Sequence, residues 1–193
     1  MISPDRIAHY FDTFAALLHG AQASAAEGGA IPISDAFAEI SSRARRAHGA
    51  GNKLMFIGNG GSAGIASHMA IDYSKNGGLR SLAFNDGAAL TCLGNDLGYD
   101  QVFAKQVEMH GRVGDVLVAI SSSGRSPNIL NAVSAARAGR IFVATLSGFD
   151  ADNPLRRMGD VNLYLASHEY GFVEIGHAAL CHAVLDLSIM GDA

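Results

Sequence analysis

The sequence has few cysteines, no long apolar run and no excess of positive charge, and each of these absences narrows its possible roles. Two cysteines, Cys92 and Cys181, among 193 residues do not suggest the disulfide framework of a small secreted domain. No apolar run approaches the roughly 18 residues that span a bilayer, and the first residues lack the basic-then-apolar layout of a signal peptide. A formal net charge of −4 leaves no basic surplus for nucleic acid phosphates. We therefore expect a cytoplasmic protein that binds neither membranes nor nucleic acid directly.

The pattern of apolar residues predicts an α/β fold with a doubly wound, five-stranded parallel sheet of the flavodoxin-like kind. Five short runs are almost wholly apolar instead of alternating, as expected for parallel strands covered on both faces. Helical spacing falls between these runs, and strand–helix alternation favours a doubly wound sheet. The expected strands are 53–57, 81–85, 116–120, 141–146 and 161–165. The expected helices among them are 62–76, 100–110 and 126–139.

The two ends of the chain are predicted to be helical. Alanine-rich stretches at about 5–27 and 34–49 carry apolar residues at three- and four-residue spacing. A glycine-containing break at 27–32 separates them, so we expect an N-terminal helical hairpin, within residues 1–50, that packs on the sheet or on another subunit. A long helix at about 172–190 closes the chain. We expect residues 1–193 to form a single domain.

Two turns rich in glycine and serine follow two of the expected strands. The first spans 57–62 (Ile-Gly-Asn-Gly-Gly-Ser) and the second spans 120–128 (Ile-Ser-Ser-Ser-Gly-Arg-Ser-Pro-Asn). Ser126-Pro127 alone is an ordinary helix start, with serine as N-cap and proline at the first helical position. Three further hydroxyls at 121–123 favour a ligand, because open α/β sheets bind ligands at the carboxyl ends of their strands. Free N–H groups at a helix start favour an anion, so the two turns predict a floor for a phosphorylated ligand.

Neither turn matches the two common nucleotide motifs. No Gly-Lys-Ser/Thr follows either turn, which excludes a P-loop. Gly58, Gly60 and Gly61 have the wrong spacing for the dinucleotide fingerprint. The sequence therefore favours a mononucleotide or a sugar phosphate over NAD.

Two expected helices carry side chains that can bind a metal or move a proton. His68 and Asp72 are four residues apart and share a helix face, which suits two ligands of one divalent ion or a base and its partner, although such a pair is usually a surface hydrogen bond. The last helix adds Glu174, His177 and His182 within an apolar stretch. Helical spacing slightly favours His177 as the partner of Glu174, because these two residues share a helix face. His182 is rotated from Glu174 by about 80° around the helix axis and lies roughly 12 Å further along it. Spacing leaves the choice between the two histidines open.

A short polar segment at 94–99 (Gly-Asn-Asp-Leu-Gly-Tyr) has two interpretations. It can be a simple turn before the next helix, or Asn95 and Asp96 can hold sugar hydroxyls.

Taken in chain order, these features resemble one family. They are Gly58-Asn59-Gly60-Gly61-Ser62, His68, the segment 94–99, Gly114-Asp115-Val116-Leu117 and the turn 121–128. The series is similar to the sugar isomerase (SIS) fold and, within it, most resembles the phosphoheptose (sedoheptulose 7-phosphate) isomerases. The resemblance implies a homotetramer with sites at subunit interfaces and one zinc ion per subunit, or another divalent ion. It also implies the metal ligands, which are His68, Asp72, Glu174 and His182, and so selects His182 over His177.

The resemblance also implies roles in an aldose–ketose isomerisation of a sugar phosphate. Asp72, or Glu174 in its place, would remove the proton next to the carbonyl, and His182 would move the second proton or hold the metal. The phosphate would be held by Ser121, Ser122, Ser123 and Ser126. The sugar chain would be oriented by Asn59, Gly60, Gly61, Ser62, Asn95 and Asp96.

Three positions depart from the family pattern and keep two other functions open. Asp72 stands where the family has glutamate, Glu174 where it has glutamine, and Asn76 where it has arginine. The first alternative is a non-catalytic SIS regulator that resembles replication-initiator-associating proteins and binds a sugar phosphate or a protein. The second is an isomerase for a different sugar phosphate.

Overall fold

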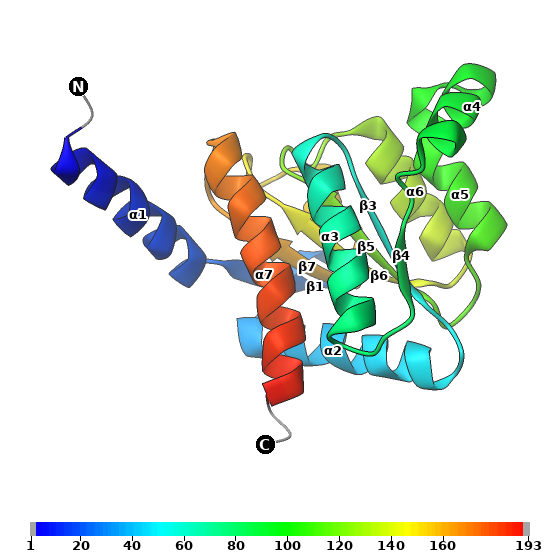
Figure 1. The fold of residues 1–193 in the computed structure, drawn as a ribbon, viewed down its shortest axis with the longest axis horizontal. Coiled ribbons are helices and arrows are strands. Elements are labelled where there is room, and N and C mark those ends of the chain that lie inside the picture. The colour runs from blue at the N-terminus through cyan, green and yellow to red at the C-terminus, as the bar shows by residue number, and fades with distance from the viewer. Residues whose placement is uncertain (1–2, 191–193) are drawn as a thin grey trace.

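The computed structural model describes residues 3–190 and contains a seven-stranded mixed sheet with helices on both faces (Figure 1). The strand order is β2-β1-β7-β6-β5-β3-β4. All five strands expected from the sequence are present and run parallel. They are β3 (Leu54–Gly58), β4 (Ser81–Ala83), β5 (Val116–Ser121), β6 (Phe142–Ser147) and β7 (Val161–Tyr164).

Two antiparallel strands extend the sheet beyond the five that were expected. β1 (Gln22–Ala25) pairs with the free edge of β7, and β2 (Ala30–Ile31) pairs with β1 after a 3-10 turn, η1 (Ala26–Gly28). The alanine-rich sequence predicted a helix up to residue 27, and this boundary was wrong. Helix propensity is a weak preference, and hydrogen bonding along an open sheet edge overrides it here.

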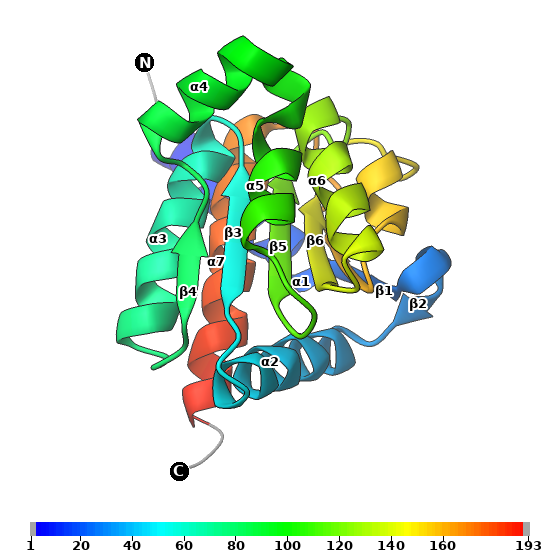
Figure 2. The ribbon, with the colours of Figure 1, turned by 90° about the vertical axis from the view of Figure 1, so that its right-hand side faces the viewer.

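The two N-terminal helices are present, although they do not form a hairpin with each other. The β1–β2 pair lies between α1 (Pro4–His19) and α2 (Ile33–Gly49). The two helices are separate in Figures 1 and 2: α2 covers the sheet next to β1 and β7, whereas α1 projects from the body and contacts α7. No residue of α1 is buried in the described chain.

Alternate residues of β3 enter two separate cores, which explains its continuous apolar sequence. Leu54 and Phe56 pack under α2, α3 (Gly61–Lys75) and α7 (Tyr170–Met190). Met55 and Ile57 pack on the other face, under α5 (Val102–His110) and α6 (Pro127–Ala138). All four side chains are fully buried. The prediction of strands covered on both faces is therefore confirmed.

The polar segment 94–99, for which a simple turn was one of two interpretations, is largely helical. It forms the end of α4 (Gly87–Leu97), and a 3-10 turn, η2 (Tyr99–Gln101), follows. Asp86 caps α4 by accepting a 2.9 Å hydrogen bond from the Ala89 N–H. A short 3-10 turn, η3 (Pro154–Arg157), precedes β7.

Helix α7 is long and apolar enough, by length and composition alone, to cross a membrane. The core helix of a folded domain meets the same test. Val173, Leu180 and Val184 of α7 are buried, and the helix packs against α2 and α3. A place in the core accounts for part of its apolar composition, since 39% of its apolar stretch is buried and Ile175 and Leu187 stay exposed.

Candidate functional site

The two turns predicted to bind phosphate lie side by side at the carboxyl edge of the sheet. Gly58 of β3 pairs with Ile120 of β5, so the segments that follow both strands meet. The Asn59 and Asn128 amides join the turns through two reciprocal hydrogen bonds of 2.9 Å. The Tyr99 hydroxyl donates a third bond of 3.1 Å to Asn59 Oδ1. Sequence reasoning gave Asn128 and Tyr99 no role, although Asn128 stands inside the motif and is almost fully buried.

The serine hydroxyls of the second turn are not used to cap the helix that follows. Ser126 occupies the N-cap of α6, yet its side chain makes no capping bond. Its Oγ instead lies 3.4 Å from Ser121 Oγ. Ser122 Oγ is buried and has no hydrogen-bond partner among the described residues. A turn built only to start a helix would use Ser126 as its cap, so this geometry favours a ligand.

The first turn also leaves the start of its helix uncapped. Gly60, the N-cap of α3, has φ +53°, which glycine adopts readily, and no side chain caps the helix. Ser62 is buried, and its backbone packs against Gly58. The Ala63 N–H already donates to the Gly60 carbonyl at 3.0 Å, so the N–H groups of Gly61 and Ser62 are the ones that can face an anion.

Two predicted sugar ligands are not joined to these turns. Asn95 and Asp96 lie exposed near the end of α4, where the Asn95 amide donates to the Asp96 carboxylate at 2.8 Å. No hydrogen bond links either side chain to the two turns in residues 3–190. Their proposed contact with sugar hydroxyls stays a prediction.

His68, Asp72 and His182 come together between α3 and α7. His68 Nε2 lies 3.2 Å from Asp72 Oδ2, and His182 Nε2 lies 3.8 Å from the same oxygen. The two imidazole rings are 5.3 Å apart, and one ligand atom from each of the three side chains fits within 4.8 Å of the others. Metal–ligand bonds of roughly 2.0–2.2 Å place neighbouring ligands of a tetrahedron about 3.3–3.6 Å apart. The His68–Asp72 pair nearly matches this spacing and His182 lies wider, so the three side chains form a group that could hold a metal ion.

The fourth predicted ligand, Glu174, lies elsewhere. Its carboxylate rests against Gly61, where a Cβ atom would clash with it, at the N-terminus of α3. The positive end of the α3 dipole and the free N–H groups there stabilise a carboxylate. Glu174 is outside the group formed by His68, Asp72 and His182. The structure thus brings together three of the four predicted ligands.

His177, which helical spacing slightly favoured, is sealed in the core. Its side chain is fully buried, and Nε2 lies 3.1 Å from the Ser147 carbonyl oxygen. Burial lowers the pKa of His177 to about 4, against a smaller opposing effect of this hydrogen bond. His182 occupies the position beside Asp72 instead, because the helix turns His177 towards β6.

The buried His177 predicts a loss of stability in mild acid. Its folded-state pKa of about 4 lies below the ordinary value of 6.5, so the unfolded chain binds the proton more readily between these values. Above pH 6.5 the imidazole is neutral in both states and burying it carries no protonation penalty. As the pH falls from 6.5 towards 4, protonation of the unfolded chain lowers the free energy of unfolding. We expect this group alone to lower the free energy of unfolding by about 2 kcal/mol between pH 7 and pH 5. Urea titrations at both pH values test this.

The matched variant for this test is His177→Gln, which retains a donor for the Ser147 carbonyl. We expect it to be less stable at pH 7 and to lose most of the pH dependence. An equally steep loss of stability in both proteins would show that other groups titrate.

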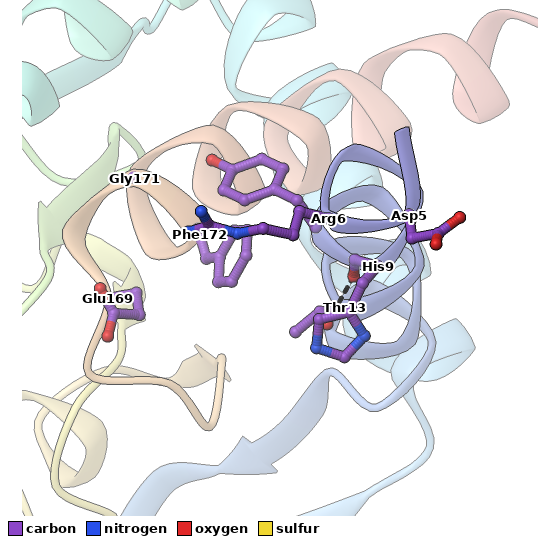
Figure 3. Close-up of a pocket in the computed structure, with 8 residues that line it drawn as sticks. Asp5, Arg6, His9, Thr13, Glu169, Gly171 and Phe172 are labelled. Carbon is purple, nitrogen blue, oxygen red and sulfur yellow. Dashed lines mark hydrogen bonds between the residues drawn. The ribbon is translucent and has the colours of Figure 1, made fainter. Parts of the chain in front are cut away.

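A separate hollow of about 580 Å³ lies between α1 and the start of α7 (Figure 3). Tyr10 of α1 contacts Phe172, with ring centroids 4.6 Å apart. None of the predicted site residues lines this hollow. Its lining residues are Asp5, Arg6, His9, Tyr10, Thr13, Glu169, Gly171 and Phe172.

Comparison with known proteins places the chain in a family. The model of the SIS domain family matches residues 9–148, and the chain belongs to this family. Among its members, the chain is similar to phosphoheptose isomerases. The phosphoheptose isomerase of Bradyrhizobium sp. (strain BTAi1) is 39% identical over 176 residues, which cover 87% of this chain and 86% of that protein.

Solved structures agree with the sequence comparison. The phosphoheptose isomerase from Neisseria gonorrhoeae superposes with a TM-score of 0.81 at 32% identity, covering 95% of this chain and 98% of that one. The enzyme from Francisella tularensis gives a TM-score of 0.81 at 29% identity, covering 97% and 98%. The resemblance to phosphoheptose isomerases inferred from the motifs is confirmed.

Proposed function

We propose that the chain is an aldose–ketose isomerase that converts sedoheptulose 7-phosphate into an aldoheptose 7-phosphate. The observation that carries this proposal is the grouping of His68, Asp72 and His182 in a chain that also presents two phosphate-type turns. Similarity over most of the chain to phosphoheptose isomerases supports the same reaction.

The phosphate is held by the second of the two turns, residues 120–128, which is the serine turn. The reacting end of the sugar lies near His68. Ser121, Ser122, Ser123 and Ser126 donate hydroxyls, and the uncapped start of α6 supplies N–H groups and a positive dipole end. The start of α3 adds its own once Glu174 turns away from Gly61. His68 stands seven residues along α3 from Gly61, which is roughly 10 Å along the helix. An extended sugar phosphate also separates its phosphate from its carbonyl by the length of its carbon chain, so the two ends of the site suit the two ends of the ligand.

Isomerisation needs two proton movements, and the site offers groups for both. Asp72 removes a proton from C1, next to the C2 carbonyl, and returns it to C2. A second proton passes between the oxygens on C2 and C1, and His182 either carries this proton or holds the metal. Carbon–hydrogen and oxygen–hydrogen bonds then balance between ketose and aldose. Glu174, held over Gly61, is the alternative base.

A divalent ion, which we propose to be zinc, would be held by His68, Asp72 and His182, with Glu174 as a fourth ligand if its side chain turns away from Gly61. Such an ion supplies polarisation of the sugar oxygens when bound.

Assembly into a homotetramer with sites at subunit interfaces would cover apolar surface that the single chain exposes. Ile7 is 49% exposed and Phe11 62% exposed on α1, and Leu187 on α7 is 60% exposed. Exposed apolar side chains of this kind are typical of surfaces that protein interfaces cover. We expect the assembled enzyme to act in the cytoplasm.

The test is turnover of sedoheptulose 7-phosphate by the purified chain, with added zinc and after chelation. We expect isomerisation that requires the metal and disappears in His182→Ala. The main alternative is a SIS regulator that binds the sugar phosphate without converting it. Tight binding with no turnover under any divalent metal would favour that regulator. Turnover of a different sugar phosphate, with none of sedoheptulose 7-phosphate, would favour an isomerase for that other sugar.

A further inference from the structure

Arg125 occupies a position in the serine turn that local electrostatics disfavour. It directly precedes Ser126, the N-cap of α6, so its positive charge stands near the positive end of the helix dipole. Helix starts favour acidic residues for the same reason. Departures of this kind from local preference are expected where a ligand compensates for them.

In the structure, the positive charge of Arg125 is paired with two exposed carboxylates. The Arg125 guanidinium lies 3.5 Å from Asp150 Oδ2 and 3.4 Å from Asp152 Oδ1. About half of the Arg125 and Asp150 side chains and most of the Asp152 side chain are exposed. Exposed pairs at such distances contribute little stability, so the guanidinium can leave them at small cost. Asp150 keeps a second neighbour, since His168 Nε2 lies 3.9 Å from its other oxygen.

The serine turn does not depend on the Arg125 side chain for its shape. The Gly148 N–H donates to the Ser122 carbonyl at 2.9 Å, and the Leu155 N–H donates to the Gly124 carbonyl at 3.2 Å. The buried Asn153 side chain packs directly beneath Gly124. Because the backbone is held by these contacts, the arginine side chain can move while the hydroxyls stay in place.

We propose that Arg125 is a phosphate-recognition residue, which exchanges Asp150 and Asp152 for the phosphate group of the bound ligand. This inference rests on the proposed function, since it places the phosphate at the serine turn. A guanidinium forms charge-assisted, often bidentate bonds with phosphate, whereas hydroxyls and N–H groups are neutral donors. The exchange gives the site a preference for a dianion, and the two aspartates act as competitors that pair with Arg125 when no ligand is bound.

The test is a mutant cycle read by calorimetric binding of inorganic phosphate to the full chain. We expect Arg125→Gln to weaken phosphate binding by about tenfold. We expect the double variant Asp150→Asn/Asp152→Asn to bind phosphate about threefold more tightly, because the competitors are gone. In the Arg125→Gln background the aspartate substitutions should change binding by less than about 1.5-fold. Arg140→Gln, on the turn after α6, is the matched control and should bind as the unaltered chain does.

Two results with the Arg125 and aspartate variants would overturn the proposal. Arg125→Gln could bind phosphate within about twofold of the unaltered chain. The aspartate substitutions could instead strengthen binding equally with and without Arg125, which would indicate simple long-range repulsion.

Ser126→Ala separates this inference from the proposed function. Phosphate binding that needs Ser126 but not Arg125 overturns the inference alone, whereas binding that is absent or independent of Ser126 removes the phosphate turn and both proposals with it.

Discussion

Replacing Asp72 with asparagine is expected to lower kcat for sedoheptulose 7-phosphate by about a thousandfold or more. The substitution keeps the size of the side chain but removes the carboxylate that contacts both histidines, at 3.2 and 3.8 Å. An amide can neither accept the C1 proton nor bind a divalent ion strongly, so base and ligand are lost together. Steady-state kinetics and metal content of the purified variant measure the two losses separately.

The control for this variant is Glu108→Gln, an equivalent carboxylate-to-amide change on α5. Glu108 is exposed and, within residues 3–190, its ion pair is with Lys105 at 3.1 Å. Helix α5 covers the other face of the sheet from α3 and α7. We expect it to keep full activity and full metal content. Near-normal kcat in Asp72→Asn with normal metal content would exclude Asp72 as the base and transfer that role to Glu174.

Substituting Gly124 with alanine is expected to distort the serine turn and to destabilise the fold. Gly124 has φ +61°, where a Cβ atom costs roughly 1–2 kcal/mol. The new Cβ would also stand 2.9 Å from Asn153 Cβ. Asn153 cannot retreat, because it is fully buried and its amide donates to the Ser147 hydroxyl and to two backbone carbonyls. We expect a total cost of about 2–4 kcal/mol and a fall in Tm of roughly 5–12 °C.

The matched control is Gly51→Ala, which separates backbone strain from the clash. Gly51 has φ +72° and no atom within 4 Å of a built Cβ. It should therefore show the strain alone, about 1 kcal/mol. Thermal unfolding followed by circular dichroism compares the two variants. Equal losses of Tm would mean that Asn153 does not fill the space beneath Gly124.

The five parallel strands and the helices α3, α5, α6 and α7 could be predicted because their apolar periodicity reflects burial directly. The continuous apolar run 53–57 requires cover on both faces, and both cores are present. Strand β1 was missed because Gln22–Ala25 has no strand signature of its own. Its conformation depends on the exposed edge of β7, which lies about 140 residues further along the chain. The helix α4 was missed for a related reason, since its glycine- and asparagine-containing end resembles a turn.

Placement of the histidines and carboxylates was only partly predictable. Spacing within α3 sufficed for His68 and Asp72, because i and i+4 side chains share a helix face. The partner from α7 depended on how that helix is rotated against α3. This rotation buries His177 against Ser147 and turns His182 towards Asp72. It also carries Glu174 to Gly61, away from the other three predicted ligands.

The amino-acid sequence by itself determined the α/β class, the two serine- and glycine-rich turns and the resemblance to phosphoheptose isomerases. These depend on residue type and local spacing, which can be read directly from the sequence. The family resemblance had already selected His182 over His177, and the structure brings it beside His68. Only the tertiary structure decided that Asn128 and Asn59 bind the turns together, that Glu174 lies at Gly61 and that Arg125 faces two aspartates. Such contacts join residues far apart in sequence, and they follow from helix rotation and sheet register, which local periodicity does not encode.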